Sequence, residues 1–225
     1  MITTPLPLFP LRLVLLPGAV VPLHIFEPRY RAMIGDVTEG NSATHQFGLI
    51  SPPQDSDEAD LPAGRIGCVA QITSVDTMPD GRANILVEGG DRFRFETYVN
   101  TGSLYRMAHV SAFDDAPDDA AIRKDLAGTV RDLAARAIRA TMTVHDVTAE
   151  PPELEADDAA LSFQLAHLLQ LDDRTLYALL CDRSPIARLI VLRVALERRL
   201  SDIGDAAELH VRAKTNGHHH GPPPT

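Results

Sequence analysis

The spacing of apolar residues changes near Asp114, and this change constrains the fold more than any other feature of the sequence. Before it, short apolar runs are separated by Pro, Gly and Asp, which is typical of β-rich structure. After it, apolar residues recur every three to five positions, as they do in amphipathic helices. The sequence therefore predicts an α+β protein with a β-rich lobe over residues 1–114 and a helical bundle lobe over residues 115–204. A disordered tail is expected over residues 205–225, which are rich in His and Pro at their end.

Within the β-rich lobe, apolar runs of strand length cover residues 6–9, 20–26, 46–51, 65–77, 83–88, 92–99 and 104–113. Pro22 places the second run at a sheet edge or a bulge, because proline cannot donate a ladder hydrogen bond. Asp80 and Gly81 predict a tight hairpin turn, and another turn is expected at residues 89–91. Strict alternation over residues 92–96 predicts two buried phenylalanines and a solvated face that carries the charged residues.

Helix signals are local and specific. Pro28 suits the first position of a short helix that runs to Val37. Asp118 and Asp119 can cap a long helix, whose apolar stripe is formed by Ile122, Leu126, Val130, Leu133, Ala137 and Met142. Two shorter helices are expected over residues 159–169 and 172–180. Ser184 and Pro185 open a last helix, with an apolar face of Leu189, Leu192, Leu196 and Leu200.

The formal net charge of −10 opposes general binding to nucleic acids and to anionic membranes, because both repel an acidic surface. Cys68 and Cys181 lie far apart in apolar stretches, which favours free thiols over a disulfide or a metal site. The N-terminus lacks the basic start and the uninterrupted apolar run of a signal peptide, and no stretch approaches the ~20 apolar residues of a membrane span. We therefore expect a soluble cytoplasmic protein.

Motifs for common catalytic and metal chemistry are absent. The sequence has no glycine-rich phosphate loop, no Gly-x-Ser-x-Gly nucleophile motif and no His-Glu-x-x-His zinc motif. His24 and Glu27 lie in an extended stretch, where residues three apart point to opposite faces, so they do not form a catalytic pair. His145 with Asp146, the histidines at 218–220 and the acidic loop at 55–60 also lack the spacing of a defined site. We expect no catalytic residue, no metal site and no cofactor.

Four segments carry a specific signature. They are LPLFPL with VLLPGAVVPLHIFEPRY at residues 6–11 and 14–30, IGCVAQI at 66–72, DGR at 80–82 and LVEGGDRF at 86–93. In this order they resemble the substrate-binding domain at the N-terminus of Lon proteases, especially its stand-alone bacterial forms. The helical half is similar only in its pattern, so the resemblance covers about residues 3–203.

Each signature residue also has a physical reason to serve the fold. Pro17 and Gly18 make a turn, Pro22 protects a strand edge, and Gly67 and Gly89 permit bends or close backbone approach. Three charged residues are candidates for one structural ion-pair network, namely Glu27, Arg29 and Arg92. We therefore expect the signature to specify the fold more than a ligand contact.

The resemblance implies a PUA-like β pseudo-barrel followed by a helical bundle. In full-length Lon this module helps to select unfolded or degron-bearing proteins, whereas a following ATPase ring and a Ser-Lys peptidase carry out proteolysis. The chain ends soon after its last helix, so both parts, and the zinc-binding domain of cereblon-type proteins, are expected to be missing. The resemblance thus implies a non-enzymatic protein linked to proteolysis and quality control.

Three function classes follow. The first is a module that binds unfolded or specific polypeptides in an apolar groove, as an adaptor or a holdase. We expect Phe26, Tyr30 and Met33 to form its surface patch, because aromatic–methionine clusters adapt to varied partners; the alternative is that they are core residues at the lobe boundary. The second class is an RNA-binding PUA-like protein, which the net charge opposes, and the third is a hydrolase without a known motif.

Overall fold

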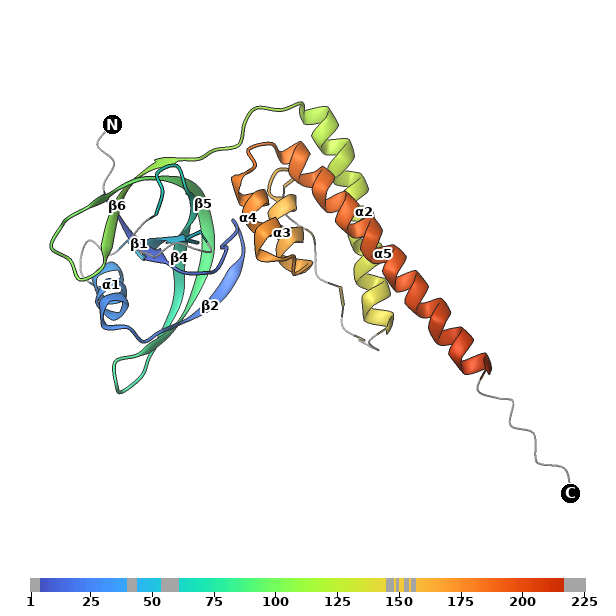
Figure 1. Cartoon of the computed structure of the whole chain (residues 1–225), viewed down its shortest axis with the longest axis horizontal. Coiled ribbons are helices and arrows are strands. Elements are labelled where there is room, and N and C mark those ends of the chain that lie inside the picture. Colours follow the sequence, from blue (N-terminus) through green and yellow to red (C-terminus); the bar gives the residue numbers. More distant parts are fainter. Residues whose placement is uncertain are drawn as a thin grey trace, which may run out of the picture. The chain divides into compact units, whose positions relative to one another are not determined.

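The computed structural model describes residues 5–39, 44–53, 61–144, 148, 150, 151, 154 and 157–216, with the backbone alone for residues 144 and 204–216. Within these residues the chain forms six strands and five helices (Figure 1). The strands are β1 (Leu6–Pro10), β2 (Val20–Ile25), β3 (Gln46–Ile50), β4 (Ile66–Thr77), β5 (Ala83–Val99) and β6 (Arg106–Ala112). The helices are α1 (Pro28–Thr38), α2 (Ala120–Val144), α3 (Leu161–Leu168), α4 (Asp173–Cys181) and α5 (Pro185–Asn216). The predicted α+β class is confirmed.

The strands form one mixed sheet that closes on itself. Their order is β2-β5-β4-β3-β1-β6, and β6 also pairs with β5. Five strands therefore make a closed ring, and β2 extends this ring through its pairing with β5 alone. β1 runs parallel to β3, whereas the other pairs are antiparallel. Because a closed ring leaves no unpaired edge, β2 provides the free edge in the described part of the sheet.

β5 is one continuous strand of 17 residues, so the turn predicted at residues 89–91 is wrong. Its first part, Ala83 to Glu88, pairs with β2, and its second part, Phe93 to Val99, pairs with β6. β4 pairs with both parts, with bulges after Cys68 and Ile72. The two glycines thus lie where β5 exchanges one neighbour for another, and the chain does not reverse there.

The core of the barrel is made of alternate strand residues and of one helix face. One buried cluster comprises Leu8, Ile50, Leu61, Phe93, Phe95 and Ala108. Pro28 is the first residue of α1, as predicted, and the buried residues of this helix are Tyr30, Met33, Ile34 and Val37. Their spacing places them on a single face. Since the rings of Phe9 and Tyr30 lie 3.9 Å apart between centroids, α1 packs directly on β1.

The chain divides into two compact units. The first combines Met1–Pro117 with Ser162–Pro185, and the second combines Asp118–Leu161 with Ile186–Thr225. α3 and α4 thus group with the sheet, where the backbone N–H of Ile66 donates a 3.3 Å hydrogen bond to the Tyr177 hydroxyl of α4. The domain boundary expected at residue 114 stays a prediction.

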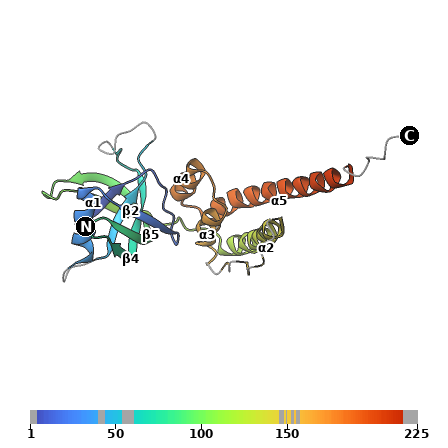
Figure 2. The same cartoon turned by 90° about the horizontal axis from the view of Figure 1, so that it is seen from below.

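The second unit contains α2 and most of α5, which run side by side in both views (Figures 1 and 2). Asp119 caps α2 as predicted, since its Oδ1 accepts hydrogen bonds from the backbone N–H groups of Ala121 and Ile122 at 2.9 and 3.2 Å. The buried residues of α2 are Ala127, Val130, Ala134 and Ala137. The predicted stripe is therefore wrong at Ile122, which is 55% exposed.

α5 begins at Pro185, as the sequence predicts, and Leu189, Leu192 and Leu196 on it are fully buried. It continues to Asn216, beyond residue 205 where a disordered tail was expected. The His triplet at 218–220 lies outside the described residues. None of the helices in the described part of the chain combines the length and the apolar character that a bilayer crossing requires.

Candidate functional site

An apolar groove of about 220 Å³ lies where β2, the end of β1 and the start of α1 meet. It is lined by Phe9, Pro10, Leu11, Pro22, Leu23, His24, Ile25, Phe26, Glu27 and Tyr30. Small-molecule sites usually enclose about 300–1,000 Å³. The groove is smaller than this range, so it suits single side chains of a polypeptide better than a whole metabolite.

The groove has an aromatic floor and an exposed aromatic residue at its side. Phe9 and Tyr30 form the floor, and the guanidinium of Arg29 lies 4.5 Å from the centre of the Tyr30 ring. Phe26 is 60% exposed, and its ring stacks on that of His24 with centroids 6.0 Å apart. His24 is held in turn by a 2.7 Å hydrogen bond between its Nδ1 and the Oδ1 of Asn84. The Phe26 side chain is therefore exposed to solvent, whereas the His24 side chain on which it stacks is hydrogen-bonded to β5.

The surface patch expected at Phe26, Tyr30 and Met33 does not form. Tyr30 is 3% exposed and Met33 is fully buried, whereas Phe26 is exposed. The physical reason is the helical period, because Tyr30 and Met33 belong to the face of α1 that packs on the barrel. The apolar residues over residues 30–37 recur with this helical spacing. This sequence signal would have predicted that Tyr30 and Met33 are buried while Phe26 is not.

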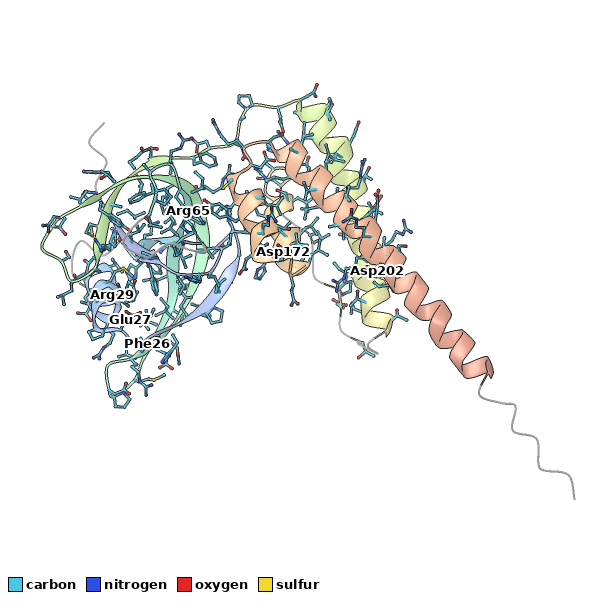
Figure 3. The ribbon with its side chains drawn as sticks, viewed as in Figure 1. Phe26, Glu27, Arg29, Arg65, Asp172 and Asp202 are labelled. Atoms are coloured by element: carbon cyan, nitrogen blue, oxygen red, sulfur yellow. The ribbon has the colours of Figure 1, made fainter. Side chains whose placement is uncertain are left out.

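Glu27 and Arg29 lie at the start of α1, next to Phe26 (Figure 3). Their side chains form an ion pair of 2.8 Å, and each is 38% exposed. Arg92, the third member of the expected network, pairs with Asp115, which the sequence analysis did not select. An exposed pair of this kind contributes about 0–1 kcal/mol to stability. Of its two members, only Glu27 lines the groove, where it adds a charged group to an otherwise mostly apolar lining.

Arg92 is buried, although the alternation of β5 predicts a solvated face for it. Its Nη1 donates to the carbonyl oxygens of Leu180 and Asp182 at 2.9 and 2.8 Å, and its Nη2 donates to Asp115. The guanidinium also lies 5.0 and 5.3 Å from the ring centres of Phe113 and Phe163. The partners of Arg92 lie 23 to 90 residues away in the sequence, which is why no local pattern revealed them.

The remaining signature residues lie at tight backbone positions. Pro17 and Gly18 form a turn, with Gly18 at φ 74°, and its N–H donates to the Gly89 carbonyl at 2.7 Å. A Cβ at Gly89 would lie 2.0 Å from the carbonyl oxygen of Leu16. A Cβ at Gly67 would lie 2.4 Å from the Phe93 ring. Pro22 lies on the edge strand β2, where a missing N–H breaks no pairing inside the sheet.

Both cysteines are free thiols, as the sequence predicts. Burial, together with the nearby Asp91 charge, raises the pKa of Cys68 to about 12. Burial also raises the pKa of Cys181. The reactive thiolate form is therefore scarce at neutral pH, and neither thiol is an activated nucleophile.

The side chains that the structure describes contain no group of three His, Cys, Asp or Glu residues able to hold a metal ion. The pair His145 and Asp146 and the acidic loop at 55–60 lie outside the described residues. What the described geometry offers is a groove, an exposed ring and a free strand edge. In other proteins, extended peptides can add to free strand edges.

The closed barrel with an edge strand and accompanying helices is an α+β domain of the Lon N-terminal type. The family described as the ATP-dependent protease La (LON) substrate-binding domain matches residues 5–198. The chain belongs to this family.

Solved structures share its fold. A Lon N-terminal domain protein from Xanthomonas campestris is 27% identical, with a TM-score of 0.58, and the match covers 84% of this chain and 97% of that one. The N-terminal domain of the Mycobacterium avium complex Lon protease is 21% identical, with a TM-score of 0.63, over 86% and 98% of the two chains. The second likeness shows the fold alone.

Curated relatives are much longer proteins. The Lon protease of Flavobacterium johnsoniae is 29% identical over 117 residues, which are 51% of this chain and 14% of the protease. The Lon protease of Parabacteroides distasonis is 26% identical over 152 residues, which are 65% of this chain and 17% of the protease. The match spans less than a fifth of the length of these relatives.

Proposed function

We propose that this protein is a non-catalytic binding module that recognises exposed apolar segments of polypeptides at the β2 groove. The observation that carries the proposal is the 60% exposed ring of Phe26 at an apolar groove beside a free strand edge. A single exposed apolar residue is common on a protein surface, but one that borders an apolar groove extends it into a continuous apolar surface of the kind that marks interaction sites. Membership of the Lon substrate-binding domain family supports the same class of ligand.

Strand addition is the mode of binding that fits the edge. An extended peptide can hydrogen-bond to the free backbone groups of β2 while one side chain enters the groove and covers Phe26. Pro22 interrupts the N–H donors in the middle of β2, so the peptide would gain its specificity from side chains more than from a full ladder. A folded protein has its strands already paired, so this mode favours unfolded segments.

The energetics suit transient capture. Burying one large apolar side chain contributes about 1.5–3 kcal/mol, and ordering the peptide offsets part of the gain from its hydrogen bonds. A dissociation constant in the micromolar range, about −8 kcal/mol, is the expected result. Such an affinity is appropriate for an adaptor that delivers a substrate or for a holdase that releases it.

The test is a titration of the protein against one labelled polypeptide, presented folded and then permanently unfolded, followed by fluorescence anisotropy. We expect saturable binding of the unfolded form alone. Phe26→Ser is expected to weaken it about tenfold, which corresponds to about 1.4 kcal/mol. Ile122→Ser is the matched control, because Ile122 is 55% exposed but lies on α2 of the second unit.

The melting temperature of each variant shows whether the fold is kept. Equal binding by both variants would exclude the groove as the site, and binding of the folded form would exclude selection of exposed segments. Tight, salt-sensitive binding of single-stranded RNA would instead favour the RNA-binding class.

A further inference from the structure

A second hollow, of about 670 Å³, lies in the first unit between the loops of the barrel and α4. Three arginines line it from separate parts of the sequence: Arg12 follows β1, Arg65 precedes β4, and Arg174 belongs to α4. Ser51 and Tyr177 also line it. The fold therefore brings three arginine residues to the wall of one hollow, which we call the arginine cleft.

Arg65, which is labelled in Figure 3, is held in place by two contacts. Its Nε donates a 2.5 Å hydrogen bond to the carbonyl oxygen of Ser51, and its guanidinium lies 4.0 Å from the centre of the Tyr177 ring. Burial, with a contribution from Cys181, raises the pKa of Tyr177 to about 12, so this ring stays neutral. In the described residues the two terminal nitrogens of Arg65 have no hydrogen-bond acceptor. They are oriented donors for a ligand.

Among the residues that the structure describes, the lining of the cleft carries more positive than negative side chains. Arg12 and Arg174 are exposed, and among the described side chains no carboxylate forms an ion pair with any of the three arginines. Asp173 is the acidic residue in the described lining, and it lies in the first turn of α4, where the helix dipole favours a carboxylate. In a chain of net charge −10, a hollow lined by three arginines is a local positive site that attracts an anion.

We propose that the arginine cleft binds an acidic segment of the captured polypeptide, through the carboxylates of its Asp and Glu side chains. Guanidinium groups bind carboxylates in a planar, two-bonded geometry, and they are better suited to this than lysine. The inference rests on the proposed function, because it assigns a second feature, negative charge, to the same class of ligand. RNA is disfavoured here, since the Tyr177 ring on which a base would stack is already covered by Arg65.

The test uses a fluorescent Gly/Ser peptide that carries several glutamates, and a matched peptide with glutamine in their place. Wild-type protein is expected to bind the glutamate peptide, to bind the glutamine peptide at least about tenfold more weakly, and to lose affinity as salt is added. The double variant Arg12→Gln/Arg174→Gln is expected to lose about tenfold or more in affinity for the glutamate peptide. Both residues are exposed, so the fold is kept.

Arg198→Gln/Arg199→Gln is the matched control, because it removes the same charge from exposed positions on α5. Binding within about twofold of wild type is expected for this control. An equal loss in both double variants, equal binding of the two peptides, or tighter binding of single-stranded RNA at the cleft would each overturn the proposal.

The Phe26→Ser variant distinguishes the proposal for the β2 groove from the proposal for the arginine cleft. It is expected to bind the glutamate peptide as wild type does, because that peptide has no apolar side chain for the groove. Loss of unfolded-polypeptide binding in Phe26→Ser, with no glutamate binding by wild type, would refute the cleft alone. Unchanged polypeptide binding in Phe26→Ser, with cleft-dependent glutamate binding, would refute the groove alone.

Discussion

At the scale of single residues, two kinds of contact hold the barrel and the helices of its unit together. Arg92 places a full charge in the interior, where it is 7% exposed, and offsets the loss of water with two carbonyl acceptors and the Asp115 carboxylate. Removing one partner of such a buried pair costs about 3–5 kcal/mol. Gly89 acts in a different way. Because it has no side chain, the turn at Gly18 can approach its backbone closely enough for the Gly18 N–H to donate a hydrogen bond to the Gly89 carbonyl.

Gly89→Ala is expected to destabilise the protein, because its new Cβ would lie 2.0 Å from the Leu16 carbonyl oxygen. Overpacking of this kind costs about 1–3 kcal/mol of unfolding free energy, measurable by urea denaturation. The neighbouring Gly90→Ala is the control, since its nearest atom would be the Val69 carbonyl oxygen at 3.5 Å, an ordinary contact. Equal stability of the two variants would show that the turn at Gly18 can move away from β5.

At the scale of elements, helix starts in this chain are fixed by side chains that the sequence already displays. Asp172 is the N-cap of α4, and its carboxylate accepts hydrogen bonds from the backbone N–H and the hydroxyl of Thr175 at 3.0 and 2.7 Å. These bonds hold the pKa of Asp172 below its ordinary value, and the bond from the Thr175 hydroxyl makes the largest contribution. The start of α4 matters for the molecule because Arg174 and Tyr177 on this helix line the arginine cleft.

Asp172→Asn is expected to change the pH dependence of stability. Because the folded pKa of Asp172 is lower than the unfolded one, its stabilisation is complete above the unfolded pKa of about 4 and is lost as the pH falls through the folded pKa. Wild type should therefore be more stable than the variant at pH 7, and the difference should shrink below about pH 4. Unfolding free energies measured at several pH values check this.

Thr175→Val is the companion variant to Asp172→Asn, because it removes the hydroxyl that contributes most to the pKa shift. It should reduce the pH dependence of stability in the acid range without removing the carboxylate. Parallel pH profiles for wild type and Asp172→Asn would contradict the assignment of this pH dependence to the cap.

At the scale of the whole molecule, the chain combines a closed barrel unit with a unit made of α2 and α5. Closure gives the strands of the ring two neighbours each, so no ring strand can leave without breaking two sets of hydrogen bonds. Among the strands that the structure describes, β2 alone lies outside this constraint, because it pairs with β5 and with no other strand. The element that borders the candidate groove is thus also the one with the fewest backbone partners.

Cys68 reports on the opening of the barrel. It is fully buried on β4, between β3 and β5, and burial raises the pKa of its thiol to about 12. In a Cys181→Ser background, alkylation of Cys68 should be slower by orders of magnitude than in the unfolded chain. Its rate should rise with urea at the slope of global unfolding of this unit. A fast rate that does not depend on urea would show that β4 opens locally.

The sequence by itself determined the features that depend on neighbouring residues. The starts of α1 and α5 at Pro28 and Pro185 follow from the fixed φ of proline. The hairpin at Asp80 and Gly81 and the cap at Asp119 follow from equally local rules. The signature of the first 93 residues also identified the family, because it fixes residue types at many positions at once.

The tertiary structure alone decided what depends on distant partners. It closed the barrel by pairing β6 with β5, and it kept β5 continuous where two glycines looked like a turn. It buried Arg92 under helices that come some 90 residues later. It also brought Arg12, Arg65 and Arg174 to the same cleft. Local patterns do not encode these outcomes, because each depends on which segments meet in space.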